Sequence, residues 1–283
     1  MSDPLSPSVD ELLAAWRARV DADHAQVERC REVEDPADFY APVTGRFRVD
    51  PRRTDDPSLN ALLSLAQPGD LWLDIGAGGG RYALPLALAV REVVAIDPSP
   101  SMLAALVEDA AAAGIENARV IEGRWPVDAG PGGDVPGGDV ALMAHVGYDI
   151  AEIGPFLDAA DAAARRLCVA VLSEAAMTTV ATMFWTEIHG EPRVRLPALP
   201  ELLVLLLARG RLPEVRLVDR TPHSLTSVEE ALSMARRQLW LREGSAKDEQ
   251  LTRFVRDSIS ERDGRYAFDW TPSKIGVVTW SPT

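Results

Sequence analysis

The chain has 283 residues, which suits one enlarged domain or a domain with a substantial cap. It is 47% hydrophobic and 25% charged, as globular proteins usually are, and its formal net charge is −14. A protein that grips phosphate backbones or anionic membranes needs a basic surface, so this charge disfavours both partners. Its two cysteines are far apart and indicate neither a disulfide framework nor a metal site. With no secretion signal and no apolar stretch of membrane-spanning length, the sequence predicts a cytoplasmic protein.

The N-terminal region predicts a helix followed by an irregular segment. Ser8 and Glu11 are spaced as a capping box, and apolar residues then recur on one helical face as far as Val27. We expect this long amphipathic helix to pack on the main domain or to line its open face. Residues 35–53 carry prolines, aromatic residues and several arginines without a clear period, so no regular element is predicted there.

A short apolar strand with a glycine-rich turn organises the rest of the chain. After a helix predicted over 57–67, an apolar run begins at Leu71, ends at Asp74, passes through the glycines of residues 76–80 and continues into a helical segment over 81–87. Glycines at such a turn allow positive φ and let a ligand lie against bare backbone, with helix N–H groups directed at an anionic group. This stretch predicts a site for a nucleotide-like molecule.

A second strand, predicted over 92–97, ends at Asp97 and is followed by Pro98. An acidic residue here, roughly 20 residues after the glycines, is placed to accept hydrogen bonds from both ribose hydroxyls of an adenosine. The alternative interpretation of Asp97 is a turn residue or a helix cap. The Ala-rich run over 102–113 predicts a helix that Gly114 ends.

Together the two stretches resemble motif I and the following strand of class I S-adenosylmethionine (SAM)-dependent methyltransferases. The places of the acidic residue and the alternating glycines are occupied by Asp74, Gly76, Gly78 and Gly80. The dinucleotide fingerprint also fits loosely, with Ala83 as its last position, so a nicotinamide-dependent oxidoreductase is a rival interpretation. The methyltransferase resemblance is specific over about 71–172 and topological elsewhere. It implies an α/β fold with a doubly wound, mostly parallel seven-stranded sheet, and SAM as the cofactor.

The resemblance also assigns cofactor contacts at the first turn, after the second strand, after a third strand predicted over 118–122, and at the end of a fourth predicted over 139–143. These residues are Asp74, Gly76, Ala77, Gly78, Gly80, Asp97, Pro98, Met102, Gly123, Arg124, Trp125 and Ala144. Family members commonly carry an aspartate that accepts a hydrogen bond from adenine where this chain has Arg124, which cannot accept one. Backbone groups could read the adenine edge instead, and Trp125 either stacks on the ligand or packs under the sheet edge.

The predicted catalytic residues follow the fourth strand, where an open parallel sheet presents the reacting edge of its ligand. In the family this segment borders the sulfonium methyl, and here it contains His145, Tyr148 and Asp149. A histidine that only fixes the loop by hydrogen bonding is the alternative. The loop before this strand carries a tandem duplication over 131–140 that lengthens a surface connection.

In the C-terminal half we predict further helices over 155–164 and 200–209, from Thr226 onward and over 247–259. Strands are predicted over 167–172 and 215–218, with a closing antiparallel strand over 274–280. Segments at comparable places in the family close over SAM or over the substrate. The candidates are Phe39, Tyr40 and Arg46 before the first strand and Trp185, Glu187 and His189 in the crossover, with ordinary packing as the alternative.

We therefore predict an N-terminal helical extension and lid segment over 1–58, and a SAM-binding methyltransferase domain over 59–283 with helical insertions near 174–212 and 226–262. The predicted reaction is methyl transfer to a small-molecule acceptor, leaving S-adenosylhomocysteine, with no metal and no nucleic acid or membrane partner. A methyltransferase acting on RNA or protein and a non-catalytic SAM-binding protein stay open as alternatives, as does the oligomeric state.

Overall fold

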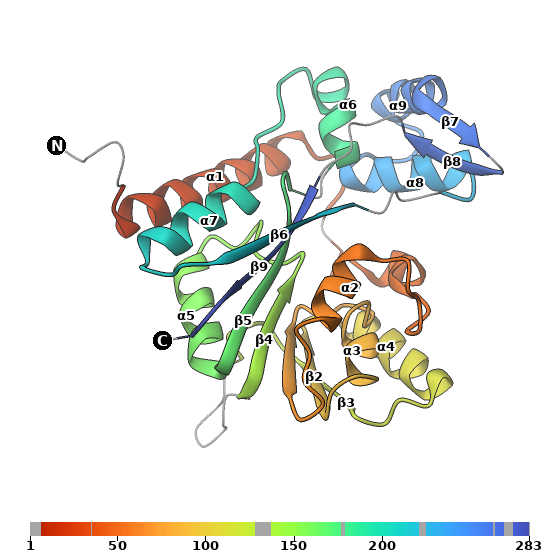
Figure 1. The fold of residues 1–283 in the computed structure, drawn as a ribbon. Helices are drawn as coiled ribbons and strands as arrows, with labels where there is room; N and C mark the ends of the chain where they lie inside the picture. Colours follow the sequence, from red (N-terminus) through yellow and green to blue (C-terminus); the bar gives the residue numbers. More distant parts are fainter. Residues whose placement is uncertain are drawn as a thin grey trace.

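One mixed sheet forms the centre of the protein. The computed structural model describes residues 7–34, 36–127, 137–176, 179–220, 225–262, 264–268 and 274–282. Within them seven strands form the sheet in the order β3-β2-β1-β4-β5-β9-β6 (Figure 1). The strands are β1 (Leu71–Ile75), β2 (Glu92–Asp97), β3 (Ala118–Glu122), β4 (Gly138–Ala144), β5 (Ala164–Ser173), β6 (Glu214–Asp219) and β9 (Lys274–Trp280).

The strand directions confirm the predicted fold class. Strands β1 to β5 run parallel, whereas β9 pairs antiparallel with both β5 and β6. β2, β3 and β9 have the bounds predicted from sequence. The duplicated loop before β4 lies outside the described residues as far as Pro136.

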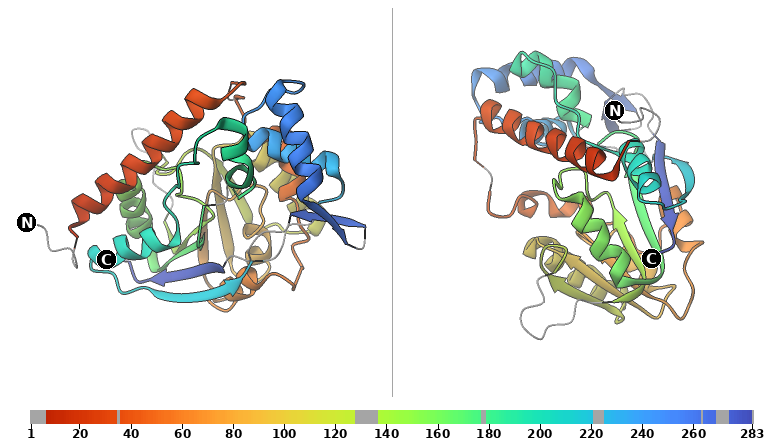
Figure 2. Two further views of the ribbon diagram at one scale, coloured as in Figure 1. Left: turned by 90° about the horizontal axis from the view of Figure 1, so that it is seen from above. Right: turned by 90° about the vertical axis from the view of Figure 1, so that its left-hand side faces the viewer.

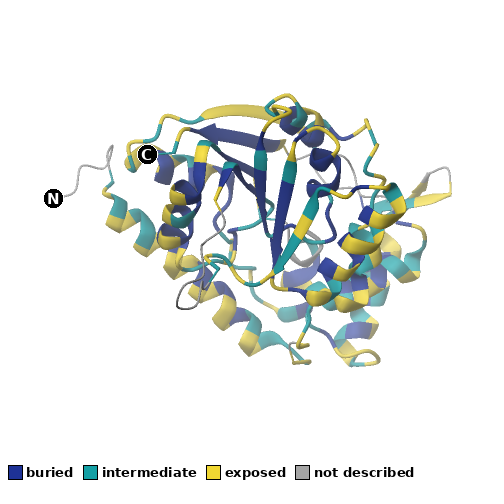
Figure 3. Cartoon of the chain, turned by 90° about the horizontal axis from the view of Figure 1, so that it is seen from below, coloured by how far each residue is buried: buried dark blue, intermediate teal, exposed yellow. Residues whose placement is uncertain are grey.

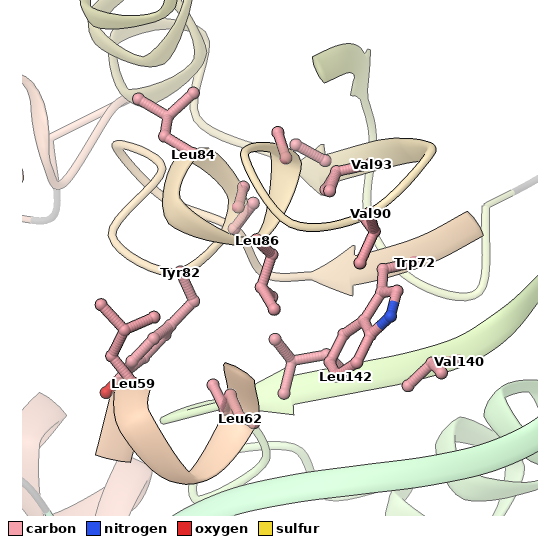
Figure 4. Packing of buried hydrophobic residues seen from close by; sticks show 14 of the residues in the cluster. Leu59, Leu62, Trp72, Tyr82, Leu84, Leu86, Val90, Val93, Val140 and Leu142 are labelled. Atoms are coloured by element: carbon pink, nitrogen blue, oxygen red, sulfur yellow. The ribbon is translucent and has the colours of Figure 1, made fainter. Parts of the chain in front are cut away.

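Side chains alternate between two hydrophobic cores on the two faces of the sheet, as the two-residue period of a strand requires. In β4, Val140 and Leu142 belong to one core, and Ala141 and Met143 belong to the other. The first core also contains Trp72 (Figure 4) and is covered by α2 (Pro57–Leu63), α3 (Ala83–Ala87) and α4 (Pro100–Ala113). The second is covered by α5 (Ile153–Ala163), α7 (Leu199–Ala208) and α1 (Val9–Cys30). Because both faces are covered, the inner strands are almost wholly buried (Figure 3).

A third core belongs to a group of elements that we call the helical cover. It consists of α6 (Thr179–His189), α8 (Val228–Gln238), α9 (Ala246–Ser258) and a hairpin of β7 (Ile259–Arg262) and β8 (Arg265–Phe268), packed around Trp185, Leu251 and Phe268. The cover and α1 lie beyond the carboxyl ends of β4 and β5 (Figure 2). The sequence predicted helices at α8 and α9 and a helical insertion near 174–212 where α6 lies, but it did not predict the hairpin of β7 and β8.

The long N-terminal helix α1 begins at the predicted capping box. Ser8 Oγ accepts a hydrogen bond from Glu11 N–H at 3.2 Å, and Ser8 N–H donates to Glu11 Oε2 at 2.9 Å. Trp16 Nε1 donates to the carbonyl oxygen of Ile150 at 3.0 Å, so α1 rests on the loop that follows β4. The prediction that this helix packs on the main domain is confirmed. Within the described residues, none of the helices is both long and apolar enough to cross a bilayer.

Residues 36–48, which we call the strap, contain a 3₁₀ helix, η1 (Ala41–Phe47), that the sequence did not predict. The strap lies over the glycine-rich turn, because a Cβ built on Gly79 would lie 3.3 Å from Phe47 Cβ. It also meets the cover, because Arg237 of α8 donates to the carbonyl oxygen of Phe39 at 2.6 Å. The strap therefore bridges the turn after β1 and the helical cover.

Candidate active site

The turn after β1 is held against the end of β2 by backbone hydrogen bonds. Gly76 and Ala77 N–H both donate to the carbonyl oxygen of Ile96, at 2.8 and 3.1 Å. Gly76, Gly78 and Gly80 all have positive φ, which favours glycine. A Cβ on Gly76 would lie 2.4 Å from Val146, and one on Gly80 would lie 2.9 Å from Leu84, whereas a Cβ on Gly78 would meet open space. A ligand can therefore rest on the backbone at Gly78.

Asp74 is a buried carboxyl group beneath this turn. It is 1% exposed, and its Oδ2 has no hydrogen-bond partner among the described residues. Burial, and after it the charge of Asp97, raise the pKa of Asp74 to about 7. A carboxyl oxygen that is buried without a partner is costly unless a ligand supplies the missing donor. Asp74 thus suits a cationic group above the turn.

Asp97 ends β2 and faces the same turn. Its Oδ2 accepts a hydrogen bond from Gly78 N–H and its Oδ1 accepts one from Ser99 N–H, both at 2.8 Å. Each carboxylate oxygen can accept a second hydrogen bond, so both remain able to receive ribose hydroxyls. Burial raises the pKa of Asp97. Pro98 is exposed beside it, and Met102 is buried in the first turn of α4.

Asp38 of the strap is a residue that sequence reasoning missed. Its carboxylate accepts hydrogen bonds from Ser99 Oγ at 2.9 Å, from Ser101 N–H at 3.2 Å and from Tyr40 N–H at 3.0 Å. Hydrogen bonds from Ser101 and then Ser99 hold the pKa of Asp38 at about 2. This carboxylate fastens the strap to the N-terminus of α4, two residues after Asp97. No local period in the sequence marks such a contact.

Gly123, Arg124 and Trp125 follow β3, and each has a different environment. Gly123 N–H donates to the carbonyl oxygen of Asp97 at 3.1 Å, which places this segment next to β2. The side chain of Arg124 is exposed. Trp125 is half-buried and donates from Nε1 to the carbonyl oxygen of Phe156 at 3.2 Å. It packs against the second core and against a smaller buried cluster that contains Leu73 and Ile96. Of the two interpretations of Trp125, this arrangement favours packing under the sheet edge.

His145 follows Ala144 at the carboxyl end of β4. Its φ is +58°, a left-handed conformation that non-glycine residues rarely adopt and that often marks a functional site. Its N–H donates to the carbonyl oxygen of Val171 at 2.8 Å, and its Nε2 lies 3.4 Å from the hydroxyl of Tyr82. Tyr82 is buried beside Leu59 in the first core (Figure 4). Sequence reasoning did not single it out.

The other two predicted catalytic residues have different surroundings. Tyr148 is buried, and its hydroxyl oxygen accepts a hydrogen bond from Ser173 N–H at 2.7 Å, which ties the loop after β4 to the end of β5. Burial raises the pKa of Tyr148. Asp149 is exposed at the same edge. All three residues therefore lie at the sheet edge where they were predicted. The contacts of Tyr148 are those of a residue that positions the loop.

The candidate lid residues mostly contact the helical cover. Arg46 lies 3.5 Å from a carboxylate oxygen of Glu230, and the ring of Phe39 lies 4.2 Å beneath the guanidinium of Arg237. Within the cover, Trp185 is fully buried and Glu187 is exposed. His189 contacts the carbonyl oxygen of Leu239 and Lys247 Nζ, at 3.1 and 3.2 Å, and so joins α6 to α8 and α9.

This chain resembles known proteins in part of its sequence and in its fold. Residues 73–130 match the family model described as a methyltransferase domain. No curated protein sequence matches the chain. Among solved structures, YcgJ protein from Bacillus subtilis is 18% identical, with 80% of this chain and 98% of that chain covered and a TM-score of 0.54. Magnesium protoporphyrin IX methyltransferase from Synechocystis PCC 6803, solved with S-adenosylhomocysteine, is 15% identical, with 86% and 96% covered and a TM-score of 0.52.

Residues 73–130 therefore match a methyltransferase domain, and the fold of the chain is that of solved methyltransferases, which agrees with the predicted SAM-dependent class and with SAM as the expected cofactor. The match favours SAM over a nicotinamide cofactor, a choice that the glycines alone left open. The residues present fit SAM: the unpartnered Oδ2 of Asp74 suits its ammonium group, the open side of Gly78 leaves room above the turn, and Asp97 keeps free lone pairs for a ribose.

Proposed function

We propose that the protein methylates a small-molecule acceptor, and that His145 orients this acceptor or removes its proton. The observation that carries the proposal is the enclosure of the reacting edge. α1 rests on the loop after β4 through Trp16, and the strap and helical cover lie beyond the same edge (Figure 2). An enclosed edge suits a small acceptor better than a macromolecule, and the net charge of −14 disfavours nucleic acid.

The chain's own residues mainly bind, orient and exclude water. Bound SAM supplies an activated methyl group on a sulfonium, so catalysis depends chiefly on placing the acceptor atom in line with that methyl. An imidazole nitrogen of His145 takes the acceptor's proton where the acceptor must lose one. Tyr148, bonded to Ser173, fixes the loop that carries His145 and Asp149. Asp74 and Asp97 hold the opposite, cofactor side of the site.

The similar structures support a small acceptor only by analogy. The enzyme from Synechocystis is named for its action on magnesium protoporphyrin IX, which is a small molecule. At 15% identity that likeness establishes the fold alone. The acceptor of the present protein is therefore argued from its own enclosure and charge.

The test is to incubate the protein with methyl-labelled SAM and a cell extract separated into low-mass, protein and RNA fractions. We expect label in the low-mass fraction, and about 10²-fold less or lower with His145→Asn protein at matched SAM binding. Label in the RNA fraction together with steep salt dependence would establish the RNA alternative. Binding of SAM without label in any fraction would establish the non-catalytic alternative.

A further inference from the structure

A buried polar cluster joins α1, α6 and the segment between α6 and α7. Arg193 Nη2 lies 2.6 Å from Asp23 Oδ1, and the guanidinium carbon of Arg193 lies 4.1 Å from the centre of the Trp185 ring. The side chains of Asp23 and Arg193 are each 6% exposed, and Trp185 is fully buried. Burial of polar and charged groups costs desolvation free energy, so each polar atom of the cluster should have a hydrogen-bond partner.

The backbone that carries Arg193 is fixed on both sides by one side chain. Gln26 of α1 is buried, and its amide donates to the carbonyl oxygen of Pro192 at 2.8 Å while its oxygen accepts from Val194 N–H at 2.8 Å. Arg193 is therefore held in place before any ligand binds. Preorganisation of this kind is typical of a recognition site.

The cluster has unfilled donors. Within the part of the chain that the structure describes, Arg193 Nε, Arg193 Nη1 and Trp185 Nε1 are buried and have no hydrogen-bond partner. The other large buried tryptophans differ, because Trp72 Nε1 donates to Asp70 at 3.2 Å and Trp280 Nε1 donates to Asp161 at 2.8 Å. Asp23 Oδ1 is likewise buried without a hydrogen-bond partner, so the cluster holds one unfilled acceptor beside three unfilled donors. An oxygen supplied by a ligand would satisfy the donors that outnumber this acceptor.

The cluster is linked to the loop after β4 through the buried face of α1. The buried face of α1 consists of Trp16, Val20, Asp23 and Gln26. On this face Trp16 donates a hydrogen bond to the loop after β4, and Gln26 donates one to the segment around Arg193. Asp23 lies between these two contacts. The pKa of Asp23 is raised, first by burial and also by the charge of Asp149 in that loop, which agrees with this placement.

We propose that Asp23, Trp185 and Arg193 form the acceptor-recognition site, and that the acceptor presents a neutral carbonyl oxygen, of the amide, ester or ketone type, to the unfilled N–H groups. This inference rests on the proposed small-molecule function. Asp23 already neutralises Arg193, and Asp149 adds a negative charge nearby, so an uncharged oxygen is accommodated better than a carboxylate. The cluster thus selects the acceptor, while His145 acts on its reacting atom.

Acetamide and acetate are matched probes for this site, because they differ mainly in charge. The full chain is labelled with ¹⁵N, saturated with S-adenosylhomocysteine and titrated with each probe while NMR spectra are recorded. The indole N–H signal of Trp185 is followed in these spectra. This signal is assigned as the one that disappears in W185F. We expect a saturable shift with acetamide and a weaker one, or none, with acetate. Absence of a saturable acetamide shift, or tighter binding of acetate, overturns the proposal.

Two pairs of variants separate recognition from packing. R193K is expected to weaken the acetamide response of Trp185 by about fivefold or more, whereas R209K, at a mostly buried arginine paired with Asp158, leaves it unchanged. W185F is expected to lower Tm less than W280F, because only Trp280 loses a hydrogen bond. An unchanged response in R193K, or equal losses in the two tryptophan variants, contradicts the proposal.

Failure of this inference is distinguishable from failure of the proposed function. Affinity for S-adenosylhomocysteine and label transfer from SAM are measured on the same preparations. Label in RNA or protein, with the acetamide response intact, refutes the small-molecule function alone. Label in the low-mass fraction without an acetamide response refutes the recognition site alone.

Discussion

Asp97 Oδ2 accepts a hydrogen bond of 2.8 Å from Gly78 N–H, so the carboxylate that ends one strand is bonded to the turn that follows its neighbour. The other oxygen of Asp97 accepts from Ser99 N–H at the start of α4. Three segments to which the sequence assigns cofactor contacts are thereby organised around one side chain. These hydrogen bonds are made within the chain itself, and fixing the segments in this way lowers the ordering cost of binding.

Replacement of Asp97 by alanine should therefore weaken SAM binding strongly. Loss of a charged acceptor for two ribose hydroxyls is expected to raise the Kd by about 10- to 100-fold, measured by titration calorimetry. Asp139→Ala is the matched control, because Asp139 also accepts a strand N–H, that of Leu71 at 2.8 Å, but at the opposite end of β1. An unchanged Kd in D97A, or an equal loss in D139A, would contradict the assignment.

Asp74 should make stability depend on pH in an unusual direction. Burial, followed by the charge of Asp97, raises its pKa in the folded protein to about 7, above the ordinary value of 3.8. The folded state therefore binds more protons than the unfolded state between these values, and stability falls as pH rises through this window. Asp74→Asn should be more stable than the natural protein at pH 8, with a difference that shrinks towards pH 4. Chemical denaturation at several pH values measures this, and a difference independent of pH would refute it.

The same carboxyl group should couple SAM binding to proton release. A cation beside Asp74 favours its charged form, so binding at pH 6 should release a proton that is already absent at pH 8. Calorimetry in two buffers with different ionisation enthalpies measures the number released. Asp74→Asn should abolish the buffer dependence. Equal proton release at pH 6 and pH 8 would show that Asp74 does not contact the cofactor's charge.

His145 should be needed for turnover and not for cofactor binding. Asparagine tolerates the left-handed backbone at this position, so His145→Asn separates the side chain's chemistry from backbone strain. We expect SAM affinity within about twofold and turnover reduced by about 10²-fold or more if the acceptor must lose a proton. Full turnover in this variant would leave His145 with a purely structural role.

Asp38→Asn should loosen the strap. Asparagine cannot match a carboxylate that accepts from Ser99, Ser101 and Tyr40, so we expect faster dissociation of SAM in stopped-flow fluorescence with little change in Tm. Asp50→Asn is the control, because Asp50 only caps a local turn by accepting from Arg52 N–H at 2.9 Å. Equal dissociation rates for the two variants would refute a role of the strap in retaining the cofactor.

Features set by short-range patterns could be predicted from sequence. β2 and β3 have the expected bounds because each is a short run between clear turn signals, and Asp97 lies at the edge where it was expected. The helix predicted over 57–67 is shorter, because it ends at Leu63, although Leu65 and Ala66 beyond its end still pack against the first core. Trp125 could not be decided from sequence, because its partner Phe156 lies on a helix beyond β4.

The parts of the site that the sequence did not reveal depend on contacts between distant segments. Asp38 of the strap accepts a hydrogen bond from Ser99 beside α4. Arg193 of the crossover forms an ion pair with Asp23 of α1. No sequence motif predicts such pairs, because each charged residue taken alone is indistinguishable from an ordinary surface residue. Only the fold shows that these particular charges are paired with partners from distant segments.

The position of β9 has a consequence for biosynthesis. β9 lies between β5 and β6 and pairs with both, although β6 precedes it by two helices and a hairpin. During translation β6 must therefore wait, without a neighbour in the sheet, until residues 274–280 leave the ribosome. A nascent chain stalled before that point should be cleaved by protease within 214–219, and release of the remaining residues should confer protection.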